Sequence, residues 1–324
     1  MFKRILVPLD GSEVAAGILP FVTAIAERTE AVVTLLSVID TTSMEVSRPR
    51  AEAQSSMAAG SLFVTSSRPQ PIVDTYRTQS EEAAEEDAKT ALRAIAKRLA
   101  DKGIETRVAA ASGPVAEEIL RFAQKDGSDL IAISTHGRGA LGRAILGSVT
   151  DKIIHSSKIP TLAITPERAK NYWSDGVVLS KIMVPLDGSQ MAEEALPYAE
   201  ALARSLSLDI VLARAVKMGG FYAPYPTDPY LGSGNLELEM ESNAVEYLKG
   251  VATRLQAKGL SVSYKMLRGA YAKAIVQLAH DTPQDIVALT THGRSGLTRW
   301  VLGSVAEALV RSSGDPVLVI PPGE

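Results

Sequence analysis

The stretch Ser134-Thr135-His136-Gly137, followed after nine residues by Gly147-Ser148, decides the fold because it occurs twice. Its second copy is Thr290-Thr291-His292-Gly293, again followed after nine residues by Gly303-Ser304. Each copy follows an apolar run that predicts a buried strand (129–133 and 285–289) and leads into an amphipathic run that predicts a helix (148–157 and 304–313). Glycine lets backbone N–H groups approach a phosphate closely, and the first turn of a helix has unpaired donors. We therefore predict two copies of one nucleotide-binding α/β domain.

Length and composition agree with two domains of ordinary size. The chain has 324 residues, of which 46% are hydrophobic and only 5% aromatic, and this suits parallel sheets covered by helices. The net charge of −3 does not suggest a nucleic-acid-binding surface. The absence of cysteine excludes disulfides, thiolate chemistry and cysteine metal sites, and it is typical of a reducing compartment.

The start of the chain and its hydropathy predict a cytoplasmic protein. The residues Met1-Phe2-Lys3-Arg4-Ile5 lead straight into a predicted strand, with no long apolar region or cleavage site, so we expect no signal peptide. No stretch approaches twenty apolar residues, so we expect no membrane span and no membrane partner.

A second repeated motif ends the first predicted strand of each half. Strands at 3–9 and 181–186 end in Asp10-Gly11-Ser12 and Asp187-Gly188-Ser189, an offset of 187 − 10 = 177 residues. The two serines are placed to cap helices that run to about residues 28 and 205. Each helix has a proline ten residues after the aspartate, and we expect a kink in mid-helix there.

The remaining segments repeat in the same order in both halves. Second strands at 32–39 and 209–216 precede long loops at 40–78, which we expect to be partly disordered, and 217–235, whose tyrosines we expect to pack on the domain or on a bound ring. After the loops the offset is 293 − 137 = 156 residues. The elements expected there are helices with apolar stripes (Leu92, Ile95, Ala96, Leu99; Leu248, Val251, Ala252, Leu255), strands at 105–111 and 261–267, helices at 114–125 and 270–280, and last strands at 161–165 and 316–320.

This alternation predicts an α/β fold with two tandem doubly wound domains. Each is expected to hold a five-stranded parallel sheet in the order 3-2-1-4-5, with right-handed crossovers. The predicted domains are residues 1–166 and 179–324, joined by a linker at 167–178 in which Trp173 packs in a seam between the halves.

The three repeated motifs together resemble the universal stress protein family in a tandem two-domain form. The matching residues are the Val-Pro-Leu-Asp-Gly-Ser ends of the first strands, the His-Gly-x9-Gly-Ser motifs, and the closing strands Pro-Thr-Leu-Ala-Ile and Pro-Val-Leu-Val-Ile. The resemblance covers nearly the whole chain and implies the nucleotide-binding α-hydrolase-like fold. The nucleotide-binding branch of the family has Gly-x2-Gly-x9-Gly-Ser/Thr, and here Ser134 and Thr290 stand in place of its first glycine.

The resemblance also implies an adenine-nucleotide site in each half, for ATP, AMP or ADP with or without magnesium. Asp10 and Asp187 would hydrogen-bond the adenine amino group, and Val38 and Ala215 would contact the ring. The residues implied for the first site are Pro8, Asp10, Val38, Ser134, His136, Gly137, Arg138, Gly147, Ser148, Val149 and Thr150. Those implied for the second site are Pro185, Asp187, Ala215, Thr290, His292, Gly293, Arg294, Gly303, Ser304 and Val305.

One difference between the halves would make the two sites unequal. Ala306 lacks the hydroxyl of Thr150, so we expect the first site to hold phosphate better. By resemblance, the last strands of the two halves pair with each other, which gives an intrachain pseudo-dimer, and a further homodimer is compatible with it.

Simpler interpretations of the same residues stay open. Each aspartate can begin a turn and assist a helix cap, at a place where open α/β sheets also bind ligands. His136 and His292 are better explained as turn residues than as catalysts. Arg138 and Arg294 either pair with phosphate or belong to a solvated loop. The acidic run at 81–87 is explained as a solvated first helical turn, not as a metal site.

Three functions compete at this point. The first is a stress-response regulator or sensor that binds an adenine nucleotide without catalysis, because we find no nucleophile–base pair, metal-ligand cluster or Gly-Lys-Ser/Thr phosphate loop. The second is a dimeric interaction scaffold that has lost the nucleotide, which the residues at 134 and 290 motivate. The third is an enzyme on a related nucleotide-binding fold, but Leu9-Asp10-Gly11-Ser12 matches neither the His-x-Gly-His nor the Ser-Gly-Gly-x-Asp-Ser signature.

Overall fold

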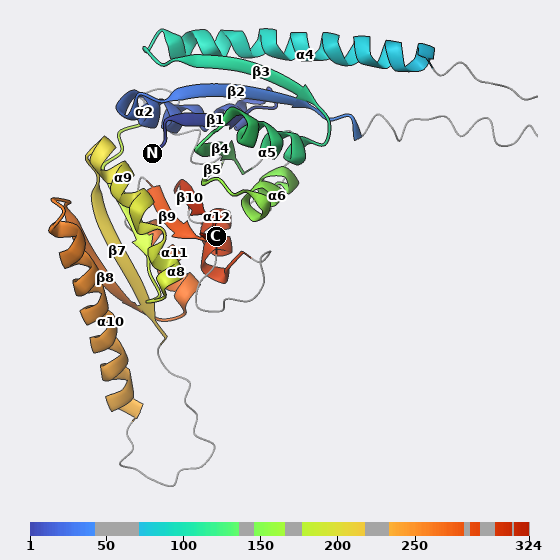
Figure 1. Ribbon diagram of the computed structural model, residues 1–324. Helices are drawn as coiled ribbons and strands as arrows, with labels where there is room; N and C mark the ends of the chain where they lie inside the picture. Colours follow the sequence, from blue (N-terminus) through green and yellow to red (C-terminus); the bar gives the residue numbers. More distant parts are fainter. Residues whose placement is uncertain are drawn as a thin grey trace, which may run out of the picture.

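One ten-stranded sheet runs through the whole molecule in the computed structural model (Figure 1). The structure describes residues 1–42, 71–135, 146–165, 177–217, 233–281, 286–291, 302–312 and 314–323, with the backbone alone at 71–80 and 233–236. The strand order is β3-β2-β1-β4-β5-β10-β9-β6-β7-β8, so each half has the predicted order 3-2-1-4-5. The predicted fold class is therefore confirmed.

The elements of each half follow the predicted alternation. Those of the first half are β1 (Arg4–Pro8), α1 (Glu13–Ala16), α2 (Leu19–Thr29), β2 (Val32–Ile39), α4 (Pro71–Ala100), β3 (Thr106–Ser112), α5 (Val115–Asp126), β4 (Leu130–Ser134), α6 (Ser148–Ser156) and β5 (Thr161–Ile164). Those of the second half are β6 (Lys181–Pro185), α8 (Gln190–Glu193), α9 (Leu196–Leu206), β7 (Asp209–Val216), α10 (Ser233–Gln256), β8 (Val262–Arg268), α11 (Tyr271–Asp281), β9 (Ile286–Thr290), α12 (Ser304–Ser312) and β10 (Val317–Ile320).

The strands are parallel within each half and antiparallel where the halves meet. β1 pairs with β2 and β4 in parallel, and β6 pairs with β7 and β9 in the same way. β5 and β10 pair antiparallel, with Leu162 opposite Leu318 at the centre of this seam. The expected pairing of the last strands is thus confirmed, and both sides of β5 and of β10 are hydrogen-bonded within the chain.

The helix after each Asp-Gly-Ser turn differs from the prediction. Two helices stand where one kinked helix was expected: α1 ends at Ala16 and α2 begins at Leu19, and α8 and α9 repeat this break. Pro20 and Pro197 therefore lie in the first turn of a new helix, where a missing N–H breaks no bond. The mid-helix kink was wrong because the chain restarts the helix before each proline.

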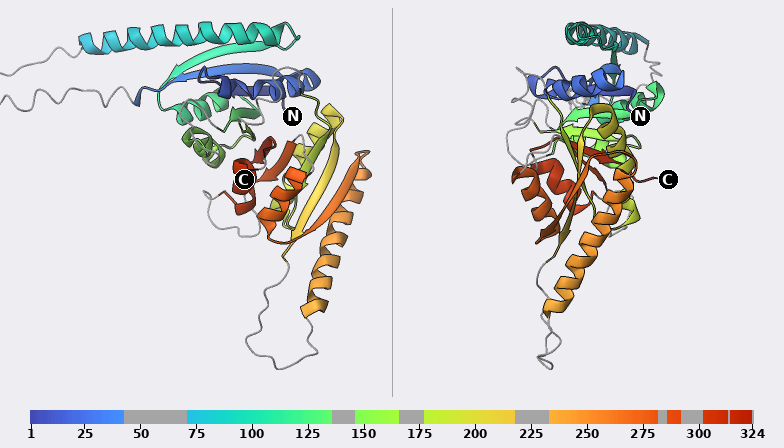
Figure 2. Two further views of the ribbon diagram at one scale, coloured as in Figure 1. Left: turned by 180° about the vertical axis from the view of Figure 1, so that it is seen from behind. Right: turned by 90° about the vertical axis from the view of Figure 1, so that its left-hand side faces the viewer.

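Helices also occupy the ends of the two predicted loops. α4 begins at Pro71 and α10 at Ser233, so residues 71–78 and 233–235 are helical. Figure 2 shows both helices extending beyond the strands they cover, at opposite ends of the molecule. The other parts of the two loop predictions, at 43–70 and 218–232, and Trp173 lie outside the described residues.

A single hydrophobic core connects the two halves on one face of the sheet. Residues of α2 and β1 belong to it together with residues of α9 and β6, and the predicted stripes of α4 and α10 pack against it. On the other face, α5 and α6 cover the first half and α11 and α12 the second, over two further cores. The core under α11 and α12 also includes Ile154 of α6 and Ala163 of β5, so it crosses the seam. The halves are therefore packed as one body and not joined by a linker alone. Across the described residues, each helix is too short or too polar to span a bilayer.

Candidate functional site

Each Asp-Gly-Ser turn is closed by its own side chains at the carboxyl end of a central strand. Asp10 Oδ1 accepts hydrogen bonds from Ser12 N at 2.9 Å and from Ser12 Oγ at 2.6 Å. Asp187 Oδ1 accepts one from Ser189 N at 2.9 Å. The two serines then cap α1 and α8, each accepting from a backbone N–H at 3.1 Å. The aspartates therefore have the turn-and-cap role, and this role fixes each carboxylate at the end of its strand.

In each half, a backbone hydrogen bond joins the glycine of the Gly-Ser motif to the threonine that follows the preceding strand. Gly147 N donates to Thr135 O at 2.9 Å, and Gly303 N donates to Thr291 O at 2.7 Å. Thr135 N in turn donates to Ile164 O at 2.7 Å, and Thr291 N donates to Ile320 O at 3.1 Å. The start of α6 is thereby held against the end of β4, and the start of α12 against the end of β9. Thr135 and Thr291 were missed as site residues because the motif pointed to its glycines.

The first turns of α6 and α12 offer backbone donors. Gly147 is the N-cap of α6 and provides no side-chain cap, and the first helical bond runs from Asp151 N to Gly147 O at 2.8 Å. The N–H groups of Ser148, Val149 and Thr150 therefore have no acceptor within the helix. The equivalent bond in α12 runs from Glu307 N to Gly303 O at 2.9 Å, which leaves the amides of Ser304, Val305 and Ala306 in the same position. Such a turn fits an anionic phosphate.

The side chain that replaces the first motif glycine points away from this helix start, although the backbone oxygen of Ser134 is bonded to Thr150 of α6. Ser134 is the last residue of β4, where alternate side chains face opposite sides of the sheet. Ile131 and Ile133 pack on the α5 and α6 side, whereas Leu130 and Ala132 pack in the shared core. By this alternation Ser134 faces the shared core, where its buried Oγ has no hydrogen-bond partner among the described residues. The side chain at 134 therefore lies on the face of β4 opposite to α6.

Thr290 has the same place in the second half. It ends β9, in which Val287 and Leu289 pack on the α11 and α12 side and Ala288 packs in the shared core. Alternation places the Thr290 side chain on the shared-core face as well. Both replacements of the motif glycine are therefore compatible with a ligand at the helix start.

The hydroxyl of Thr150 is used inside the fold. Thr150 is 3% exposed, and its Oγ1 donates to Ser134 O at 3.0 Å. This bond ties α6 to β4, so the structure gives no support to the expectation that this hydroxyl strengthens the first phosphate site. Ala306, the counterpart in α12, is equally buried and lacks the tie.

The residues expected beside the adenine ring lie on the helix α5 and α11 side of the sheet ends. Val38 packs against the core under α5 and is paired with Ala111 of β3. Ala215 is buried in the core under α11. Pro8 and Pro185 are buried at the ends of β1 and β6. The structure therefore brings these residues to the same edge as the aspartates and helix starts.

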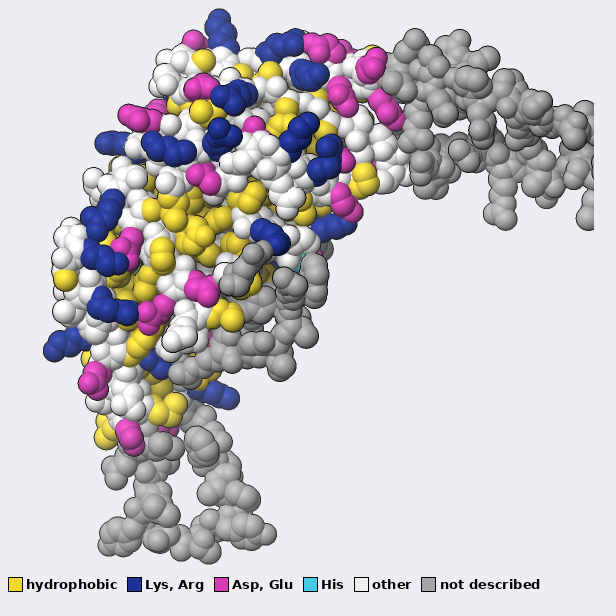
Figure 3. All heavy atoms as spheres, in the orientation of Figure 1, with side chains coloured by type: hydrophobic (Ala, Val, Ile, Leu, Met, Phe, Trp, Pro, Cys, Tyr) yellow, Lys and Arg dark blue, Asp and Glu magenta, His cyan; other side chains and the backbone are white. Residues whose placement is uncertain are grey.

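Six of the predicted residues lie outside the described part of the chain: His136, Gly137, Arg138, His292, Gly293 and Arg294. Within the described part, no group of three His, Asp or Glu side chains is arranged to hold a metal ion. On the face seen in Figure 3, basic and acidic side chains are interspersed.

This geometry defines the doubly wound class of α/β proteins, in which ligands bind at the carboxyl ends of the strands where the strand order reverses. Comparison with known sequences agrees at the level of the family. The chain belongs to the universal stress protein family, whose sequence model matches residues 1–61, 51–165 and 179–321.

Individual relatives match one half or the whole chain. A universal stress protein of Methanocaldococcus jannaschii is 32% identical over 141 residues, which are 43% of this chain and 81% of that protein. One of Synechocystis is 23% identical over 321 residues, which are 98% of this chain and 99% of the relative. The crystal structure of a universal stress protein from Archaeoglobus fulgidus superposes over the full length of both chains with a TM-score of 0.68 at 18% identity, a likeness of fold.

Proposed function

We propose that this protein is a stress-response regulator or sensor that binds an adenine nucleotide, ATP, ADP or AMP, in each half. The observation that carries the proposal is the backbone hydrogen bond that holds each Gly-Ser helix start against its strand end. This bond runs from Gly147 to Thr135 in the first half and from Gly303 to Thr291 in the second. It supports a site in which uncapped helical amides and a strand-end carboxylate share one edge of the sheet. An anion is favoured at the amides and a hydrogen-bond donor at the carboxylate, and an adenine nucleotide has both.

Each part of the nucleotide has residues that fit it. The amides of Ser148 and Val149, and of Ser304 and Val305, would hold phosphate oxygens. Asp10 and Asp187 would accept from the adenine amino group. Val38 and Ala215 would cover the ring, and the glycines of the motifs would leave room for ribose.

The energies require these contacts to act together. One favourable contact between a charge and a helix end contributes about 0.3–1 kcal/mol. Micromolar affinity needs about 8 kcal/mol. Ring burial and several backbone donors must therefore combine, and the loss of one carboxylate should be measurable.

We propose binding without catalysis and a monomeric chain that forms its pseudo-dimer internally. The carboxylates of Asp10 and Asp187 hold turns, which suits an acceptor of fixed position more than a group that exchanges protons. The seam strands β5 and β10 have a paired neighbour on both sides, so a further homodimer would need a different surface. We place the protein in the cytoplasm, in line with its cysteine-free composition.

The test has two steps. Purified full-length protein is heat-denatured and the supernatant is chromatographed for adenine nucleotides, and ATP, ADP and AMP are then titrated calorimetrically into nucleotide-free protein. We expect two sites per chain, one lost in Asp10→Ala and the other in Asp187→Ala. Asp209→Ala, which removes an exposed aspartate at the opposite edge of the sheet, is the matched control.

The result that would reject the proposal is an empty protein that gives no heat with any of the three nucleotides. That outcome would favour the interaction scaffold. Steady phosphate release from ATP that disappears in His136→Ala and His292→Ala would instead favour an enzyme.

A further inference from the structure

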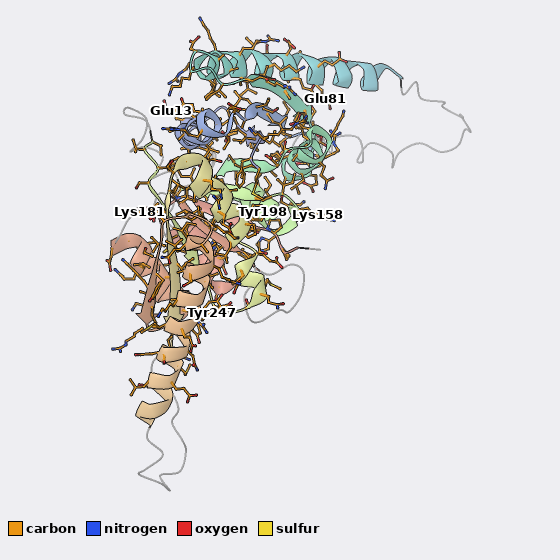
Figure 4. All side chains as sticks on the ribbon, turned by 60° about the vertical axis from the view of Figure 1, so that its left-hand side comes forward. Glu13, Glu81, Lys158, Lys181, Tyr198 and Tyr247 are labelled. Atoms are coloured by element: carbon orange, nitrogen blue, oxygen red, sulfur yellow. The ribbon has the colours of Figure 1, made fainter. Side chains whose placement is uncertain are left out.

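A cluster of polar side chains lies behind the Asp-Gly-Ser turn of the second half. Tyr247 Oη, on α10, donates to Glu193 Oε1, on α8, at 2.8 Å. Arg254, about two turns further along the same face of α10, donates to the other oxygen of Glu193 at 2.5 Å. The guanidinium carbon of Arg214, on β7, lies 4.9 Å from the centroid of the Tyr247 ring, within cation–π range. Figure 4 labels Tyr247 on α10.

The guanidinium of Arg214 also lies directly against the turn. Gly188, the middle residue of the turn, has a φ of +90°, and a Cβ added to it would lie 3.1 Å from the guanidinium atoms. Arg214 thus contacts the Tyr247 ring and lies beside the backbone of Gly188. This arrangement links the turn that carries Asp187 to helices α8 and α10.

Arg214 reaches the turn from the α10 face of the sheet. Its neighbours Ala213 and Ala215 belong to the core under α11 and α12, whereas Leu212 belongs to the shared core under α10. By strand alternation the Arg214 side chain lies on the α10 face. It therefore reaches the turn from this face, at the carboxyl end of β6.

The phenol of Tyr247 is held in its protonated form. Burial raises the pKa of Tyr247, and the hydrogen bond to Glu193 raises it further. The hydroxyl thus remains a donor to the carboxylate, which keeps the ring in place under the guanidinium.

The first half has small residues at the equivalent positions. With the offset of 177 residues, Arg214 corresponds to Ser37 and Glu193 to Ala16, and with the offset of 156 residues Tyr247 corresponds to Ala91. None of these three can form the stack of cation, ring and carboxylate. A comparison of the two halves in the sequence would have shown these three differences, but not that the side chains meet.

We infer that Arg214, supported by Tyr247 and Glu193, is a positioning residue that holds the Asp187-Gly188-Ser189 turn in place, so that the two halves offer unequal nucleotide sites. The positioning follows from the contacts alone, and the inequality of the sites rests on the proposed function. A turn that is already held loses less freedom when a ligand binds. The second site therefore binds the nucleotide more tightly and fills first.

The positioning is tested without any ligand, by amide hydrogen exchange of the full chain resolved by NMR. The reporters are the amides of Ser189 and Ala192, whose acceptors are the side chains of Asp187 and Ser189. The equivalent amides of Ser12 and Ala15 in the first half are internal controls. In Arg214→Ser, and equally in Tyr247→Leu, the reporters should exchange about threefold to tenfold faster while the first-half amides are unchanged. The double variant should add little to either single one.

The matched control is Arg268→Ser, which removes a cation paired with Glu241 of the same helix α10 but not in contact with the turn. Unchanged exchange of Ser189 and Ala192 in Arg214→Ser would overturn the inference. An equal acceleration in Arg268→Ser would also overturn it, because the effect would then belong to α10 as a whole.

The inequality of the sites is tested by ATP titration in two backgrounds. Asp10→Ala isolates the second site and Asp187→Ala isolates the first. Adding Arg214→Ser should weaken the second site about threefold to tenfold and leave the first unchanged. Equal affinities in the two backgrounds would overturn the inequality. If the exchange rates change but wild-type protein binds no nucleotide, the proposed function fails and the positioning role stands.

Discussion

The ring of Phe2 lies 6.2 Å from the ring of Tyr198, centroid to centroid, at an interplanar angle of 54°. This contact joins a residue two positions before β1 to α9 of the other half, and Figure 4 labels Tyr198 where the halves meet. Phe2 is 1% exposed and belongs to the core that both halves share. The halves are thus connected through side chains as well as through the seam of β5 and β10.

Phe2→Ala should destabilise the whole chain, not the first half alone. Removing a buried phenylalanine side chain costs about 3–5 kcal/mol of unfolding free energy. Because the core is continuous, urea denaturation followed by circular dichroism should show one transition, shifted to lower urea. Tyr264→Ala, which removes a ring that is 39% exposed on β8, should change the unfolding free energy by less than about 0.5 kcal/mol. Two separate transitions, in wild type or variant, would contradict the shared core.

The hydrogen bond between Thr150 of α6 and Ser134 of β4 predicts opposite effects on stability when either hydroxyl is removed. Thr150→Val removes the donor to Ser134 O and leaves that buried carbonyl short of a partner, which should cost about 1–3 kcal/mol. Ser134→Ala removes a buried hydroxyl that has no partner among the described residues, so stability should be unchanged or higher by up to about 1 kcal/mol. Denaturant titration of both variants measures the difference. A larger loss in Ser134→Ala than in Thr150→Val would show that the Ser134 hydroxyl has a role in the fold.

The ion pair between Lys152 of α6 and Glu117 of α5 predicts a pH-dependent contribution to stability. The hydrogen bond from Lys152 lowers the pKa of Glu117 below its ordinary value of 4.5. A carboxyl whose pKa is lower in the folded state contributes stability above its unfolded pKa, and this contribution is lost as the pH falls through the folded pKa. Lys152→Met should therefore lower Tm slightly at about pH 7, and this effect should diminish as the pH falls below 4.5.

The control for this pair is Lys102→Met, at an exposed lysine in the turn after α4. It should show no such dependence on pH. Since both partners are about half exposed, the effect at pH 7 should also shrink in high salt. A Tm difference for Lys152→Met that persists at low pH would assign the effect to packing of the lysine stem instead.

The sequence was sufficient for the fold because the same motifs recur in the same order. Two strands, Val32–Ile39 and Asp209–Val216, have the predicted bounds, and most other boundaries moved by one or two residues. The proline kinks were wrong because Pro20 and Pro197 suit both a kinked helix and a first turn. That choice depends on the break at residues 17–18 and 194–195, which no local signal marked.

The candidate site was predictable only as far as the two halves are alike. Motif residues such as Asp10, Asp187, Gly147 and Gly303 were found because they repeat. Thr150 differs from its counterpart Ala306, and only the structure shows that the Thr150 hydroxyl donates to Ser134 O inside the fold. Arg214 and Tyr247 were missed because they come from different segments, and their contact depends on how α10 packs against β7.

A comparison of two glycines of the second half tests how closely Arg214 packs on the Asp187-Gly188-Ser189 turn. Gly188 and Gly259 both have a left-handed φ, of +90° and +80°, but a Cβ at Gly259 would have no neighbour within 4 Å among the described atoms. Gly259→Ala should therefore cost only the left-handed conformation, about 1–2 kcal/mol. Gly188→Ala should cost more, because the new methyl group would lie 3.1 Å from the Arg214 guanidinium and must push it away from the turn. Adding Arg214→Ser should then reduce the cost of Gly188→Ala to that of Gly259→Ala. Denaturant unfolding of the single and double variants measures this, and an equal cost of Gly188→Ala with and without Arg214 would mean that the guanidinium does not press on the turn.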